Sequence, residues 1–163
     1  MNLDKTIEQT AEPDVTSNRL QSLLEQEKAS QIFNSYTDEQ RNGLVQVIGV
    51  SRFLYHFLSR HPDAISLIGI PYQATQQSIT NFRELRLFKY RSLLQITWMD
   101  VCNTSPYEQV LFSLSHLADT VLQQSNILVA KQSENFTADI SNDLAVMALG
   151  QHVVTESGRN HLG

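Results

Sequence analysis

Four basic residues in one short segment are the first candidates for chemistry. Arg83, Arg86 and Lys89 recur every three residues, so on a helix they occupy about a third of the circumference, with Arg91 to the side. Such a group could bind phosphate or carboxylate. Alternatively, the stems pack among apolar neighbours and the charges pair within the chain. The carboxylates expected for such pairs are Glu84, Asp100 and Asp119. We favour ion pairing, because LRLFKYR is embedded in apolar sequence.

Other residue types predict no catalytic or metal site. His152, Glu156 and His161 share the C-terminal segment, but their spacing is not one that zinc ligands use. The single cysteine, Cys102, excludes an intramolecular disulfide and is expected to be a small buried residue. The chain has no nucleophile elbow, no P-loop and no paired cysteine motif. We therefore name no catalytic residue and no metal ligand.

Composition narrows the class of protein. The chain has 163 residues, enough for one domain with a core, and 41% of them are hydrophobic. The net charge of −5 gives no electrostatic footprint for nucleic acid. No apolar run approaches the ~18 residues of a membrane span, and the polar N-terminus is unlike a signal peptide. These features favour a cytoplasmic protein without nucleic-acid or membrane partners.

The elements that must position these residues are predicted to be helices. Residues 1–16 lack periodicity and are expected to form a loose tail. Residues 17–131 form the helical region. We expect Ser17 to cap its first helix, which continues to Phe33. A capping box at residues 37–40 should open the second helix. A helix over residues 51–60 stops before Pro62, which begins a short helix.

Two longer helices complete the helical region. The segment at about residues 76–99 is apolar on all sides and should be central. Residues 105–108, Ser-Pro-Tyr-Glu, signal the start of a helix of ~25 residues, or ~37 Å. Residues 132–142 form a polar connector, and residues 144–149 are apolar throughout, as in a strand covered on both faces. The predicted fold is therefore mainly α, a helical array with one C-terminal strand.

Three stretches together resemble the bifunctional glutamine-synthetase adenylyltransferase/adenylyl-removing family. Residues 51–63, SRFLYHFLSRHPD, resemble its S-x-F…RHP segment, and residues 85–100 are similar to its L-R-x-F helix that ends in aspartate. Residues 114–119, LSHLAD, resemble its L-S-x-L-A-D signature. The matching residues are Ser51, Phe53, His61, Pro62, Leu85, Arg86, Phe88, Asp100, Leu114, Ser115, Leu117, Ala118 and Asp119.

The resemblance implies the N-terminal helical region of the family's first half, which removes AMP from glutamine synthetase by phosphorolysis. The strand at residues 144–149 would then begin the α/β sheet of a nucleotidyltransferase domain, of which residues 143–163 are an incomplete start. In the family this strand leads into G-x-G-K-x-G-G, whose backbone N–H groups approach phosphate, and then into a Mg²⁺-binding D-x-D pair. Gly150 matches this turn and is the candidate nucleotide-binding residue.

Several positions depart from the family pattern. In the turn, Ala148, Gln151, Val153 and Val154 stand where the family motif has glycine or lysine. Gln95 and Met99 stand where the family usually has arginine. No D-x-D follows Gly150. The resemblance therefore implies ATP and Mg²⁺ for the complete family enzyme but none for this chain, which should be inactive. The implied partners are glutamine synthetase and a PII-type signal protein. The alternative is a non-catalytic helical module that binds another protein.

Overall fold

The computed structural model describes residues 3–74 and 79–132, and in this part of the chain all regular structure is helical. The elements are α1 (Leu3–Glu8), α2 (Pro13–Leu24), α3 (Glu27–Asn34), α4 (Asp38–Val50), α5 (Arg52–Arg60), the 3₁₀ helix η1 (Pro62–Leu67), α6 (Phe82–Val101) and α7 (Tyr107–Gln132). This confirms the mainly α class. The strand predicted at residues 144–149 lies outside the described residues.

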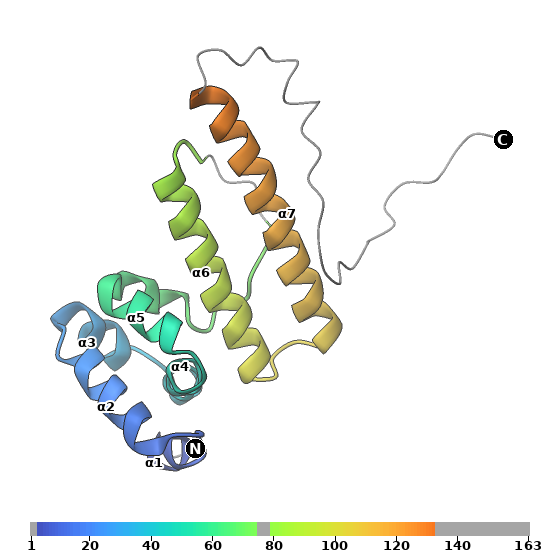
Figure 1. Cartoon of the computed structure of the whole chain (residues 1–163). Coiled ribbons are helices and arrows are strands. Elements are labelled where there is room, and N and C mark those ends of the chain that lie inside the picture. Colours follow the sequence, from blue (N-terminus) through green and yellow to red (C-terminus); the bar gives the residue numbers. More distant parts are fainter. Residues whose placement is uncertain (1–2, 75–78, 133–163) are drawn as a thin grey trace.

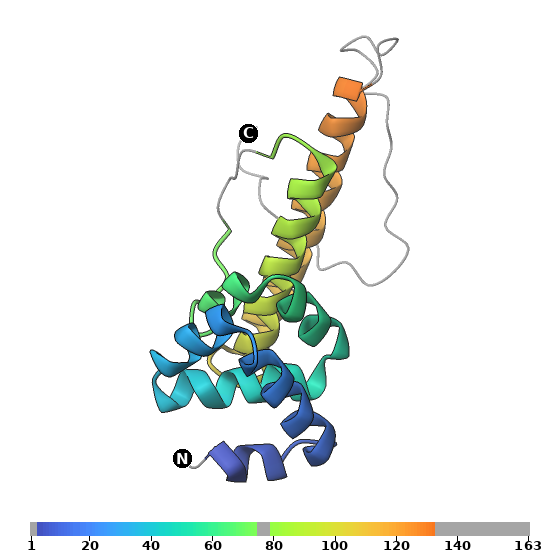
Figure 2. The ribbon, with the colours of Figure 1, turned by 90° about the vertical axis from the view of Figure 1, so that its left-hand side faces the viewer.

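The helices form two groups. The five shorter helices and η1 gather beside the C-terminal half of α6, whereas α6 and α7 run antiparallel along one another (Figures 1 and 2). Helix α4 lies centrally in the first group and contacts α1, α2, α5 and α6. Its residues Leu44, Val45, Val47 and Ile48 are fully buried. The core therefore lies around α4 and continues between α6 and α7.

Local capping bonds explain where the predicted helices begin. The amide of Gln40 donates to Thr37 Oγ1 (3.3 Å) and the amide of Thr37 donates to Gln40 Oε1 (3.1 Å), which confirms the capping box that opens α4. The amide of Leu54 donates to Ser51 Oγ (3.2 Å) at the start of α5. The long helix predicted from about residue 76 begins later, at Phe82, because the Asn81 side chain accepts from the amide of Glu84 (2.9 Å).

The N-terminal prediction is corrected by the structure. Residues 3–16, expected to be a loose tail, form α1 and the start of α2, which begins at Pro13 rather than after Ser17. Buried threonines hold this segment: Thr6 Oγ1 donates to Asn42 Oδ1 of α4 (2.8 Å), and Thr16 is fully buried. Hydrophobic periodicity cannot reveal contacts of this kind.

The first long helix is also interrupted. Between α2 and α3, the Gln26 side chain donates to the carbonyl of Ser59 (3.1 Å) instead of continuing the helix that we predicted. Arg19 of α2 similarly donates to the carbonyl of Ile48 (2.6 Å) at the end of α4. These two bonds tie the N-terminal helices to α4 and α5. Within the described residues, no helix has the length and apolar character needed to cross a bilayer.

Candidate functional site

Residues of the first two motifs lie close together where α5, η1 and α6 meet. Phe53 and Phe57 of α5 both meet the ring of Tyr90 on α6 edge to face, with centroid distances of 4.9 and 5.6 Å. The ring of His61, at the C-terminal end of α5, lies 5.1 Å from that of Phe57. Aromatic packing thus joins α5 to α6. Tyr90 was missed in the sequence because it occupies a position of the residue 85–100 motif for which the family pattern specifies no residue type.

One of the four candidate basic residues forms an ion pair at this junction. Arg91 Nη2 lies 3.1 Å from Asp63 Oδ2, which joins α6 to η1. Both side chains remain partly exposed, at 47% and 41%, so the pair contributes little, about 0–1 kcal/mol. Asp63 was not among the carboxylates that we expected, because it becomes a neighbour of Arg91 only in the tertiary structure.

The other three basic residues, Arg83, Arg86 and Lys89, lie exposed on α6 and are called the basic stripe below. Across residues 3–74 and 79–132, none of them forms an ion pair with Glu84, Asp100 or Asp119, so our expectation of ion pairing is wrong for them. Lys89 Nζ instead lies 5.8 Å from the ring centroid of Tyr90. The described residues thus leave the stripe exposed, where an anionic partner could reach it.

We expect Arg86→Ala to change the free energy of unfolding by less than about 0.5 kcal/mol, since an exposed side chain with no ion pair to the described residues contributes little. Arg91→Ala is the matched comparison and should cost up to about 1 kcal/mol, because it breaks the pair with Asp63. Urea denaturation of both variants measures the difference. A loss above 1 kcal/mol for Arg86→Ala would contradict the exposed placement.

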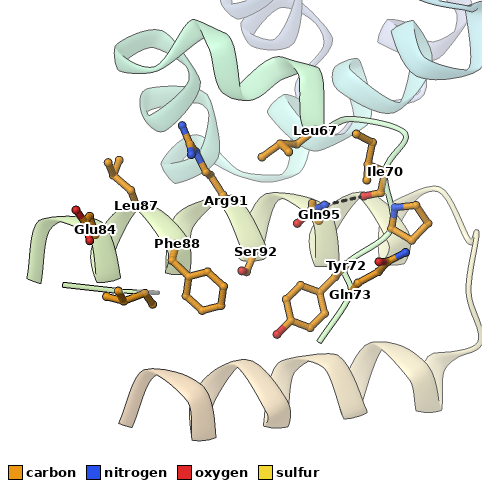
Figure 3. Close-up of a pocket in the computed structure, with 12 residues that line it drawn as sticks. Leu67, Ile70, Tyr72, Gln73, Glu84, Leu87, Phe88, Arg91, Ser92 and Gln95 are labelled. Atoms are coloured by element: carbon orange, nitrogen blue, oxygen red, sulfur yellow. Dashed lines mark hydrogen bonds between the residues drawn. The ribbon is translucent and has the colours of Figure 1, made fainter. Parts of the chain in front are cut away.

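A cavity of about 450 Å³ lies between α6 and residues 67–73 (Figure 3). Glu84 and Arg91 are the charged residues of its lining. Glu84 accepts hydrogen bonds, and Arg91 forms an ion pair. The amide and the hydroxyl of Thr80 each donate to Glu84 Oε2 at 2.8 Å, and these bonds lower the pKa of the Glu84 carboxyl. Arg91 extends toward η1, where it meets Asp63. The cavity therefore offers shape and polarity, and its described lining contains no free acid or base.

Two positions that depart from the family pattern hold one wall of this cavity. Gln95 Nε2 donates to the carbonyl of Ile70 (3.2 Å), as Figure 3 shows, and the amide of Tyr72 donates to Met99 Sδ (3.2 Å). Tyr72 also shares a hydrogen bond of 2.9 Å with His116 Nδ1 of α7, and burial raises the pKa of its hydroxyl. Gln95 and Met99 thus have a structural role in this chain, which only the fold could reveal.

A second cavity, of about 280 Å³, lies between α4 and the end of α6 and includes Cys102. The thiol donates to Gln46 Oε1 (3.2 Å). Burial, with a smaller effect from the negative charge of Glu39, raises the pKa of Cys102 to about 11. A thiol that stays protonated at neutral pH is a poor nucleophile, so this position does not supply covalent catalysis.

The remaining motif residues divide into buried and exposed positions. Leu85, Phe88 and Leu117 are buried between the long helices, at 5%, 8% and 4% exposure. The exposed positions are Asp100, Leu114, Ala118 and Asp119, and Ser115 is half-buried. The motifs therefore mark a packed unit made by α5, α6 and α7, rather than a ring of reactive groups.

The described residues contain no group of three or more His, Cys, Asp or Glu able to hold a metal ion. Gly150, the candidate nucleotide-binding residue, lies outside the described residues, as do His152, Glu156 and His161. What the described part offers is a packed helical surface with polar cavities and a basic stripe. Such a surface is suited to recognition and to positioning another domain.

Comparison with known proteins gives one result. A family model for glutamate-ammonia ligase adenylyltransferase matches residues 41–158, from within α4 to beyond the end of α7. No curated protein and no solved structure matches the chain.

Proposed function

The chain belongs to the glutamate-ammonia ligase adenylyltransferase family, and from this premise we propose that it is the helical N-terminal part of a nucleotidyltransferase acting on glutamine synthetase. The complete enzyme would transfer AMP to a tyrosine of the synthetase or remove it by phosphorolysis. The observation that carries the proposal is the family match over residues 41–158, which includes all three motifs. In support, the motif residues of α5, α6 and α7 pack as one unit.

The proposed part of this chain is recognition, not the chemical step. The complete enzyme of the family would use ATP and Mg²⁺, with carboxylates to hold the ion. The residues present do not fit such a site: Glu156 is the only carboxylate side chain after Gly150, and the described helices offer no metal-binding group. We therefore derive no catalytic step from this chain.

We expect purified chain 1–163 neither to attach AMP to glutamine synthetase nor to release it. The reason is the missing carboxylate pair, since loss of a bound metal ion forfeits several kcal/mol of charge stabilisation in the transition state. Mass spectrometry of the synthetase, incubated with ATP and Mg²⁺ or, in adenylylated form, with phosphate, measures both directions. Mg²⁺-dependent turnover that follows the chain through purification would refute the expectation.

We propose that the chain nevertheless binds glutamine synthetase in the cytoplasm, with a PII-type signal protein as a further partner. The basic stripe is the feature that supports an anionic contact. Biolayer interferometry should detect binding of the chain to the synthetase, and a charge-reversed variant, Arg83→Glu with Arg86→Glu, should bind more weakly. Arg52→Glu with Arg60→Glu, at two exposed arginines outside the stripe, is the matched control with the same change of net charge and should bind unchanged.

The binding experiment also separates the proposal from its alternative. No binding at about 100 µM chain, where even an interaction of about −5.5 kcal/mol would be visible, would overturn the proposed contact with the synthetase. A helical module for another protein would give that result. Binding without AMP transfer is the result expected from the proposal.

A further inference from the structure

Ser92, in the middle of α6, has a buried hydroxyl group without a hydrogen-bond partner among the described residues. Its side chain is only 3% exposed. The comparable serine of α7, Ser113, donates to the carbonyl of Gln109 four residues earlier (2.8 Å), but Ser92 makes no such bond within its helix. A buried polar group normally has a partner, because leaving it unpaired costs free energy. The space that Ser92 faces is therefore where a partner would have to lie.

Ser92 lines the cavity of about 450 Å³ between α6 and residues 67–73. In Figure 3 it lies along α6 between Phe88 and Tyr72, on the side of the helix that carries the Phe88 ring. Both rings line the same cavity, and both are 8% exposed. A cavity of this volume accommodates a small organic molecule. The hydroxyl of Ser92 is thus a polar contact between two aromatic walls.

The charged residues of the lining leave no counter-charge for an ionised ligand. Glu84 accepts two hydrogen bonds from Thr80, and Arg91 is paired with Asp63. Moving a further ion from water into the cavity without a free opposite charge would be unfavourable. The described lining therefore favours an uncharged ligand.

The other polar groups available in the lining are amides. Gln73 forms no hydrogen bond with the described residues, and Gln95 donates to the carbonyl of Ile70 (3.2 Å), which leaves its Oε1 as an acceptor. An amide offers a donor and an acceptor side by side, so it pairs well with a ligand that offers the same. Aromatic side chains favour contact with another ring, either stacked or edge to face.

We propose that this cavity binds an uncharged heteroaromatic molecule that carries an amide group, with the ring against Phe88 and Tyr72 and the amide bonded to Ser92. Nicotinamide is a simple molecule of this class. The proposal does not depend on the contact with glutamine synthetase, because Gln95 in the cavity and Arg86 in the basic stripe lie about 180° apart around α6.

Saturation-transfer NMR on the full chain tests the class of ligand with a matched pair of probes. Nicotinamide and nicotinate share their ring and differ little in size, but nicotinate is an anion at neutral pH. We expect nicotinamide to bind with a Kd on the order of 1 mM, as suits a molecule of its size. Nicotinate should bind at least about 5-fold more weakly, because the lining has no free cation.

Two alanine variants test the place of binding. Ser92→Ala removes the hydroxyl without adding volume and should weaken nicotinamide binding about 5-fold. Ser113→Ala is the matched control, because Ser113 is also buried, at 1% exposure, but does not line the cavity, so nicotinamide should bind unchanged. Thermal denaturation is the second readout: Ser92→Ala should keep the Tm of the parent chain, since its hydroxyl has no partner among the described residues to lose.

Four results would overturn the proposal. Absence of nicotinamide binding at about 10 mM would exclude a site for this class. Equal binding of nicotinamide and nicotinate would show that the cavity does not select by charge. Equal effects of Ser92→Ala and Ser113→Ala on nicotinamide would place the ligand elsewhere. A clear fall in Tm for Ser92→Ala would show that the hydroxyl already has a structural partner.

Discussion

Replacement of Leu117 by alanine is expected to lower the free energy of unfolding by about 2–5 kcal/mol. Leu117 lies in the third motif, on the face of α7 that packs against α6, and is only 4% exposed. Truncation removes its buried methyl groups and leaves a cavity between two long helices that have little freedom to close it. Urea denaturation followed by circular dichroism measures the loss.

Leu114→Ala is the matched control, because it makes the same change three residues earlier in the same motif. Leu114 is 39% exposed, so alanine should cost only about 1 kcal/mol. Similar losses for the two variants would show that the packing of α7 against α6 is not as described. The comparison thus tests which residues of the motif serve the core.

Replacement of Gly43 by alanine is expected to cost about 1–3 kcal/mol. A Cβ atom at this position of α4 would lie 2.6 Å from Trp98 Nε1 and 2.8 Å from Trp98 Cδ1. Trp98 is 5% exposed and cannot move aside without disturbing the crossing of α4 and α6. The usual gain from replacing a helical glycine by alanine, about 1 kcal/mol, is therefore outweighed.

Two further variants make this prediction specific. Gly49→Ala is the comparison in the same helix: its Cβ would meet the methyl group of Thr10 at 2.9 Å, far from Trp98, so its cost should not respond to a change at Trp98. Trp98→Ala, whose side chain lacks both the Cδ1 and the Nε1 atoms, should remove most of the cost of Gly43→Ala in a double-mutant cycle. Independent effects of Gly43→Ala and Trp98→Ala would rule out the proposed clash.

Helix starts were well predicted where the signal is a local bond. The capping box of Thr37 and Gln40, the cap at Ser51 and the stop before Pro62 depend on residues within one turn, so they can be identified without knowing the fold. The family was recognised in the same way, from three short motifs in order, and the match over residues 41–158 confirms it. The start of α6 was predicted less well, because Asn81 competes with earlier residues for the cap.

Long-range polar contacts were not predictable. The N-terminal segment lacks apolar periodicity, yet Thr6 bonds to Asn42, thirty-six residues away, and α1 packs on α4. The ion pair of Arg91 with Asp63 and the hydrogen bond of Gln95 to Ile70 also join residues from distant segments. Each joins residues more than twenty positions apart, so no spacing rule applies to them.

The sequence alone determined the helices that local caps and prolines open, α4, α5, η1 and α7, and the family that the chain resembles, because these signals act within a few residues. Only the tertiary structure decided which faces are covered. Leu114 and Leu117 look equivalent in the sequence, as do Arg86 and Arg91. Within the described residues, however, Leu117 and Arg91 meet partners from distant segments, whereas Leu114 and Arg86 stay exposed. Burial and pairing depend on what the rest of the chain places opposite a residue, and local sequence does not contain that information.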